Sequence, residues 1–123
     1  MIVAIYACEC TYGGLHGMYS KAVLEVSDIE EARDIAVQMS YEVMDSYESI
    51  AEDIEAEVEY AIYEQGDERD YDEIANEYYS ERVEYIIYAP SPELIKGKDI
   101  SDLDREFYQD EDTFLKKYDC HDI

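Results

Sequence analysis

The sequence is poor in positively charged residues. It has nine Lys and Arg against 33 Asp and Glu in 123 residues, so its formal net charge at pH 7 is −24. The shortage is greatest between Arg33 and Arg69, where no Lys or Arg occurs. A surface of this sign repels nucleic acid and anionic membranes, and it attracts basic protein surfaces in a fast, salt-sensitive way. We therefore expect a basic protein, rather than nucleic acid or a membrane, as the direct partner.

Other absences narrow the class of protein. There is no run of 18 apolar residues that could span a membrane. Residues 1–5 lack the positive start of a signal peptide, and Glu9 interrupts the apolar stretch that follows. The three cysteines are an odd number, unlike a disulfide framework, which agrees with a reducing compartment. We therefore expect a cytoplasmic protein.

The composition favours one folded domain over residues 1–123. Hydrophobic residues make up 47% of the chain, too many for a disordered acidic tail. Apolar patterning predicts a β-hairpin over 1–26, with strands at 2–10 and 20–26, and a third strand at 83–89. The nearly continuous apolar character of residues 2–10 indicates a strand covered on both sides. A glycine-rich loop, Gly13–Gly17, joins the first two strands.

Helical periodicity occupies the middle and the end of the chain. It predicts a long acidic helix over 28–64, a second helix over 70–81 and short helices within 93–123. Ser27 to Glu30 forms a capping box that starts the long helix. At roughly 55 Å this helix would match the width of a small domain, so a break near Ser46 or Ser49 stays open. The β-β-α-α-β-α order predicts an α+β fold with a three-stranded antiparallel sheet and the helices on one face.

The predicted long helix is amphipathic. At about 100° per residue its apolar and acidic residues separate onto opposite faces. The apolar face carries Ala36, Met39, Val43, Tyr47, Ile50, Ile54, Val58 and Ala61, and the acidic face carries Glu30, Asp34, Asp45, Glu48, Glu52, Glu55 and Glu59. Like charges at this spacing each cost a few tenths of a kcal/mol. Mixing in lysine would improve helix stability, so its omission suggests a functional role for the acidic face.

Catalytic and metal-binding interpretations find weaker support. A zinc site needs four ligands, which could come from Cys8, Cys10, His16, Cys120 and His121, but their spacing matches no familiar zinc motif. The alternative is that Cys8 and Cys10 pack in the core and the C-terminal pair lies at the surface. His16 and His121 accompany no nucleophile motif, and no carboxylate pair stands out among so many. We therefore expect a non-enzymatic protein without a cofactor or a metal.

A binding role fits the acidic face better. One helical turn rises about 5.4 Å, comparable with the spacing of phosphates along a nucleic-acid strand. A row of carboxylates could therefore meet Arg and Lys side chains that are arranged to grip DNA or RNA. Tyrosine supplies contact area at low entropic cost and stacks on arginine. The predicted partner-binding residues are Asp45, Glu48, Glu52, Glu55 and Glu59, with Tyr41 and Tyr63 beside them.

Small size, high acidity, fourteen tyrosines and the acidic helix from Asp45 to Glu59 resemble the DNA-mimicking anti-restriction and anti-CRISPR inhibitors of bacteriophages. The likeness lies in composition and charge layout over residues 28–84, and no family motif is matched residue by residue. It implies a stoichiometric inhibitor of a host defence nuclease. The lysines at 96, 98, 116 and 117 depart from this pattern, so any mimicry is confined to one side of the protein.

Two other interpretations remain open from the sequence. The acidic face is a solvated surface in the simplest one. In the other, the protein is a small phage or bacterial adaptor, or a ligand-sequestering protein. It would form a dimer and act through its sheet and the Gly13–Gly17 loop. Tyr12 and His16 would then matter more for function than the acidic face.

Overall fold

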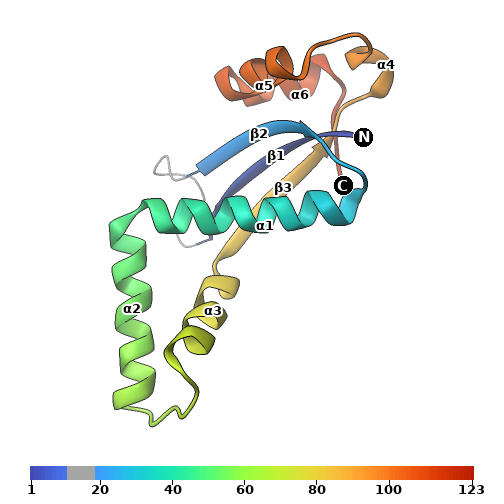
Figure 1. The fold of residues 1–123 in the computed structure, drawn as a ribbon. Coiled ribbons are helices and arrows are strands. Elements are labelled where there is room, and N and C mark those ends of the chain that lie inside the picture. Colours follow the sequence, from blue (N-terminus) through green and yellow to red (C-terminus); the bar gives the residue numbers. More distant parts are fainter. Residues whose placement is uncertain (11–18) are drawn as a thin grey trace.

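The computed structural model describes residues 1–10 and 19–123, which form an α+β fold (Figure 1). This confirms the predicted fold class. The strands are β1 (Ile2–Glu9), β2 (Tyr19–Glu25), β3 (Val83–Ala89) and β4 (His121–Asp122). The helices are α1 (Ile29–Ser46), α2 (Glu48–Tyr63), α3 (Tyr71–Glu81), α4 (Pro92–Ile95), α5 (Ile100–Gln109) and α6 (Glu111–Lys117). No helix among the described residues has the length and apolar character needed to cross a membrane.

The sheet has four antiparallel strands in the order β2-β1-β3-β4. Strand β1 is central, and its Ala4 lies opposite Val23 of β2 and Tyr88 of β3. The predicted three-stranded sheet is wrong in one detail, because the two-residue strand β4 pairs with the end of β3. Two residues near the end of the chain carry too little periodicity to be recognised as a strand.

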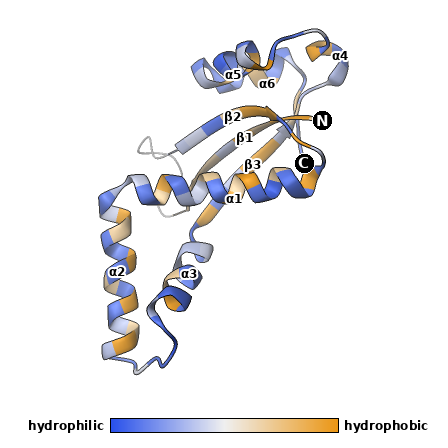
Figure 2. Cartoon of the chain, viewed as in Figure 1, coloured by the Kyte–Doolittle hydropathy of each residue, from blue (hydrophilic) through white to orange (hydrophobic). Residues whose placement is uncertain are grey.

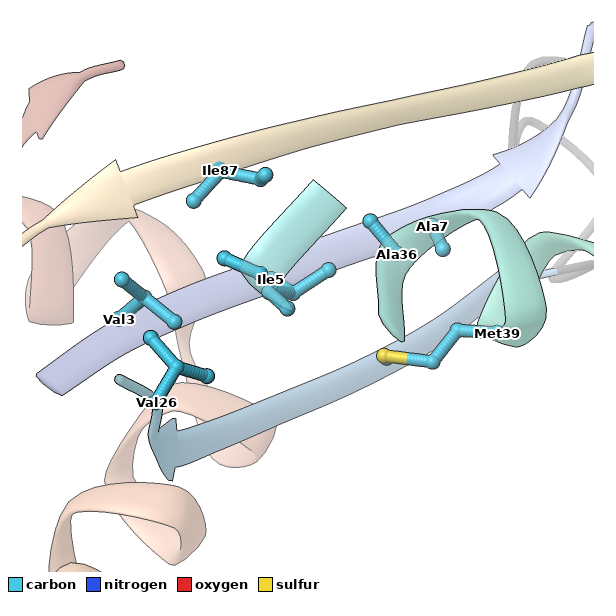
Figure 3. Close-up of a cluster of buried hydrophobic side chains, with 8 residues drawn as sticks. Val3, Ile5, Ala7, Val26, Ala36, Met39 and Ile87 are labelled. Atoms are coloured by element: carbon cyan, nitrogen blue, oxygen red, sulfur yellow. The ribbon is translucent and has the colours of Figure 1, made fainter. Parts of the chain in front are cut away.

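Helix α1 covers one face of the sheet. Figure 3 shows Val3, Ile5 and Ala7 of β1 with Ile87 of β3, close to Ala36 and Met39 of α1 and to Val26, which follows β2. All of these side chains are buried. Burying this apolar surface stabilises the contact between α1 and the sheet.

The C-terminal helices cover the opposite face, so the prediction that the helices lie on one face is wrong. Residues that alternate with the first set along the strands, such as Ala4 and Val23, contact Leu103, Phe107, Phe114 and Tyr118. The ring centroids of Phe107 and Phe114 are 5.0 Å apart, and those of Phe114 and Tyr118 are 4.8 Å apart. Coverage on both faces explains why the first strand is apolar along most of its length.

The helix predicted over 28–64 is two helices. Tyr47 lies between α1 and α2 with an extended backbone, φ −112° and ψ 107°, and there the chain turns away from the sheet (Figure 1). Helix α2 then packs against α3, burying Ile50, Ile54 and Val58 against Ile74. Hydrophobic and hydrophilic residues are interspersed along α2 and α3 (Figure 2). The predicted apolar stripe is thus divided between two clusters, one under α1 and one between α2 and α3.

The first turn of α1 is capped one residue later than predicted. Asp28 is the N-cap, and its Oδ1 accepts a hydrogen bond from the Glu31 amide at 2.9 Å. Glu31 in turn accepts from the Ser27 amide at 2.8 Å. Glu30, which was expected to make the return bond, instead contacts Arg33 at 2.8 Å. The arrangement resembles a capping box, but Glu31 accepts from the amide of Ser27, the residue before the N-cap, and not from that of Asp28.

Candidate acidic binding surface

The antiparallel pair α2 and α3 carries a large share of the negative charge. Residues 48–82, here called the α2–α3 hairpin, contain 14 Asp and Glu against two Arg, a net charge of −12. That is half of the −24 of the whole chain in 35 of its 123 residues. Because the hairpin extends away from the sheet (Figure 1), this charge lies on a projecting part of the protein.

Four of the predicted acids lie along one exposed side of α2. Glu48, Glu52, Glu55 and Glu59 are all exposed and recur every three or four residues, which keeps them on one side of a helix. We call these four residues the α2 acidic stripe. None of them forms an ion pair with any Lys or Arg in the described part of the chain. Glu57, on another side of α2, contacts Arg82 at 3.2 Å.

Two exposed tyrosines accompany the stripe. Tyr63 is 80% exposed and follows Glu59 by one helical turn, as predicted from the sequence. Tyr71 of α3 is 44% exposed and lies near the stripe. Partial burial raises the pKa of Tyr71, and the charges of Glu55 and Glu59 raise it further. The pairing of α2 with α3 brings Tyr71 to the glutamates.

Tyr41 and Asp45 occupy a different position from the stripe, because they precede the turn at Tyr47. The Tyr41 hydroxyl lies 3.1 Å from Ser80 Oγ, and its ring meets that of Tyr79 edge-to-face at 6.0 Å between centroids. Burial raises the pKa of Tyr79, and the nearby charge of Asp45 raises it further. The predicted site is therefore divided: Tyr41 and Asp45 face α3, whereas the four glutamates line α2.

A small hollow lies between α1 and α3 where these residues meet. Its volume is about 210 Å³, and its lining residues are Gln38, Tyr41, Asp45, Asn76 and Tyr79. We call it the α1–α3 recess. Its walls combine two phenol rings, one carboxylate and two side-chain amides, so it presents hydrogen-bond acceptors beside aromatic surface.

Arg82 connects the hairpin to the sheet. Its guanidinium lies 3.6 Å from Glu9 of β1 and 3.2 Å from Glu57 of α2. The Arg82 side chain is 14% exposed and that of Glu9 is fully buried. A buried carboxylate is costly unless it is paired, so removing Arg82 would take a charged partner away from Glu9 at the base of the hairpin. This contact fixes the hairpin against the sheet.

The three cysteines differ in exposure. Cys8 is buried, Cys10 is exposed and Cys120 is partly buried, and none of the three is in a disulfide. The suggestion that Cys10 packs in the core is therefore wrong. Burial raises the pKa of Cys8 to about 12 and that of Cys120 to about 11, which disfavours the thiolate needed for metal binding.

Within residues 1–10 and 19–123, no group of three or more His, Cys, Asp or Glu side chains is placed to hold a metal ion. His16, Tyr12 and the Gly13–Gly17 loop lie outside the described residues. No protein-family model matches the chain, and no curated protein or solved structure matches it. The functional argument therefore rests on the residues and geometry of this chain.

Proposed function

We propose that the protein is a non-enzymatic inhibitor that binds the basic nucleic-acid-binding surface of a host defence nuclease, of the anti-CRISPR or anti-restriction type. One observation carries the proposal. The α2 acidic stripe is a row of exposed carboxylates, on a projecting hairpin, without cationic partners among the described residues. A row of this kind offers a basic groove the negative charge that it normally finds on a phosphate backbone.

The dimensions of the stripe suit this role. From Glu48 to Glu59 the helix advances eleven residues, or about 16 Å at 1.5 Å per residue. Four carboxylates over that length meet several Arg or Lys side chains of a groove at once. Binding would displace the anions that the groove otherwise attracts, so affinity would fall steeply with salt, as it does for nucleic acid. Such a nuclease would be met in the bacterial cytoplasm.

Charge and aromatic contacts contribute differently to such a complex. The excess negative charge accelerates the approach of a basic partner and gives the complex its salt dependence. Tyr63 and Tyr71 supply contact area beside the stripe, and rings of this kind are enriched among the residues that dominate binding energy. These rings would add contact area that the exposed carboxylates do not provide.

The test uses two matched charge-reversal variants. The first is Glu48→Lys, Glu52→Lys and Glu55→Lys, which reverses three residues of the stripe. The second reverses three exposed acids outside the hairpin, Glu25→Lys, Asp34→Lys and Glu93→Lys. Both variants change the net charge from −24 to −18, so they differ only in where the charge is removed. Circular dichroism would establish that both keep the wild-type fold.

Wild-type protein immobilised on resin should capture a nucleic-acid-binding nuclease from bacterial lysate at low salt and release it as salt rises. The captured nuclease should lose DNA binding when free wild-type protein is added. We expect the stripe variant to lose this competition and the outer variant to retain most of it. If wild type and the stripe variant compete equally well with DNA, the proposed mechanism is refuted. If both variants lose competition equally, net charge alone explains binding and the position of the stripe has no role.

A further inference from the structure

We propose that the α1–α3 recess receives a single arginine side chain of the basic partner and thereby fixes the position of the protein on it. The inference rests on the proposed function, because it assumes a basic protein surface as the partner. It assigns a separate role to Tyr41 and Asp45, which lie apart from the α2 acidic stripe. The stripe would attract the basic partner, and the recess would fix the position of the protein on that partner.

The geometry of the recess suits the flat head of an arginine. Tyr41 and Tyr79 contact each other edge-to-face, with 79° between their ring planes and 6.0 Å between their centroids, so together they form one corner of the recess. A planar group in the recess would lie against the ring surface at this corner. The positions of the two rings are held by packing between α1 and α3 and by the contact of Tyr41 with Ser80 at 3.1 Å. A guanidinium stacks on tyrosine faces, and this attraction strengthens when water is excluded.

The remaining lining residues offer acceptors at the same place. Asp45 provides a carboxylate, and Gln38 and Asn76 each provide an amide oxygen. Arginine has five N–H donors in a rigid, planar fork and engages a carboxylate through two parallel hydrogen bonds. Lysine presents a compact, strongly hydrated charge that makes less use of both acceptors and rings. The recess should therefore discriminate between the two cations, which an exposed acidic stripe does not.

Asp45 has no cationic partner among the described residues. It accepts a hydrogen bond from the Tyr79 hydroxyl, and burial together with this carboxylate raises the pKa of Tyr79. No ion pair joins Asp45 to a Lys or Arg in residues 1–10 and 19–123. The cation that acts on Tyr79 from within the protein is Arg82, which already contacts Glu9 and Glu57. An incoming guanidinium would thus meet a carboxylate that forms no ion pair with a cation of the described residues.

The experiment uses peptides, so it needs no knowledge of the partner. Hexa-arginine and hexalysine carry the same charge, and their affinities for the purified protein would be measured by calorimetry in the same buffer at low salt. Two variants with the same charge change are compared with wild type. Asp45→Asn removes the carboxylate of the recess, whereas Asp53→Asn removes an exposed carboxylate of α2 outside it. Resonances of Tyr41 and Tyr79 would be followed by NMR during each titration.

We expect wild type and Asp53→Asn to bind hexa-arginine about fivefold or more tighter than hexalysine, and Asp45→Asn to bind both peptides alike. Tyr41 and Tyr79 resonances should shift with hexa-arginine more than with hexalysine. Equal affinities in wild type, or an arginine preference that persists in Asp45→Asn, would overturn the inference. The stripe variant Glu48→Lys, Glu52→Lys and Glu55→Lys should bind both peptides more weakly, and the ratio of the two affinities should stay the same. The ratio of peptide affinities therefore tests the recess alone, whereas the competition for the nuclease tests the proposed function.

Discussion

The C-terminal helices and the α2–α3 hairpin are both rich in acidic residues, but their carboxylates serve different purposes. In the C-terminal helices, acids make contacts that hold the fold together. Asp99 caps α5 by accepting from the Ser101 amide at 2.9 Å, and Asp110 caps α6 by accepting from the Thr113 amide at 3.1 Å. Asp104 reaches across to the sheet and accepts from the Val23 amide at 2.8 Å. These carboxylates are engaged inside the protein.

The α2 acidic stripe shows the opposite arrangement. Its four glutamates are exposed, and none is paired with a Lys or Arg of the described residues. They face away from the α2–α3 cluster that stabilises the hairpin. The comparison teaches that net charge is a poor guide to function on its own. The informative carboxylates are those that the fold does not use, and each of the following predictions tests this distinction.

The largest effect is expected at Asp104. Replacing it with alanine leaves the Val23 amide of edge strand β2 without its acceptor, and Val23 is only 4% exposed. An unsatisfied buried amide costs about 1–3 kcal/mol, so the free energy of unfolding should fall by that amount. Urea unfolding followed by circular dichroism would measure it.

Asp102 provides the matched control on the same helix. It contacts Arg105 at 3.5 Å, and both side chains are about two-thirds exposed. An exposed pair of this kind contributes at most about 1 kcal/mol and often nothing measurable, so Asp102→Ala should be nearly neutral. A loss at Asp104 no greater than that at Asp102 would mean that the C-terminal acids are no more structural than those of the hairpin.

Much of this fold follows from the sequence. Strand 83–89 and the apolar stripe of the acidic segment were predictable because their periodicity reflects burial, and burial was found at Ile50, Ile54 and Val58. The turn at Tyr47 was harder to place. The apolar stripe continues through it with helical spacing, since both helices bury the same side of the segment against different neighbours. Apolar periodicity indicates which side of a helix is buried, but it does not indicate which element packs against that side.

The same limit explains how far the candidate site could be predicted. Glu48, Glu52, Glu55 and Glu59 belong to one uninterrupted helix, so local spacing was enough to place them together. Asp45 belongs to the same row only if the helix runs unbroken through Tyr47, and the structure breaks it there. Tyr71 was missed because its proximity to Glu55 and Glu59 comes from the packing of α3 on α2. Tertiary contacts of this kind leave no signal in a single sequence.

A smaller effect, with a pH dependence, is expected at Glu106. Its carboxylate contacts Lys117 Nζ at 2.6 Å and also accepts from the Tyr118 hydroxyl, and these two hydrogen bonds lower the pKa of Glu106 below its ordinary value of 4.5. The ionised Glu106 carboxylate therefore stabilises the fold at pH values above its ordinary pKa. This stabilisation is lost as pH falls through the lowered pKa of Glu106. Since the side chain is 35% exposed, solvent screening limits the effect to about 1 kcal/mol or less.

Glu106→Gln should accordingly be less stable than wild type at pH 7, and the difference should shrink as pH falls below the ordinary value of 4.5 and disappear below the lowered pKa of Glu106. Urea unfolding at several pH values would show the convergence. Glu93→Gln, an exposed acid outside these contacts, serves as the control and should track wild type throughout. A constant difference between Glu106→Gln and wild type across this range would show that the loss comes from packing of the side chain and has no electrostatic origin.

The smallest effect, and the one with the opposite sign, belongs to the α2 acidic stripe. Replacing Glu52, Glu55 and Glu59 with glutamine removes repulsion between carboxylates three and four residues apart, worth a few tenths of a kcal/mol per pair. Glu48 is left unchanged because it lies in the first turn of α2, where the helix dipole favours an acid. Thermal unfolding at low salt should show a slightly raised melting temperature, and the gain should vanish at 1 M salt, where the screening length is about 3 Å. A stabilised variant that no longer competes with DNA for the captured nuclease would mean that these glutamates are retained at the expense of stability. A destabilised variant would mean that these glutamates stabilise the fold, as Asp104 does. The difference between the C-terminal helices and the hairpin would then be lost.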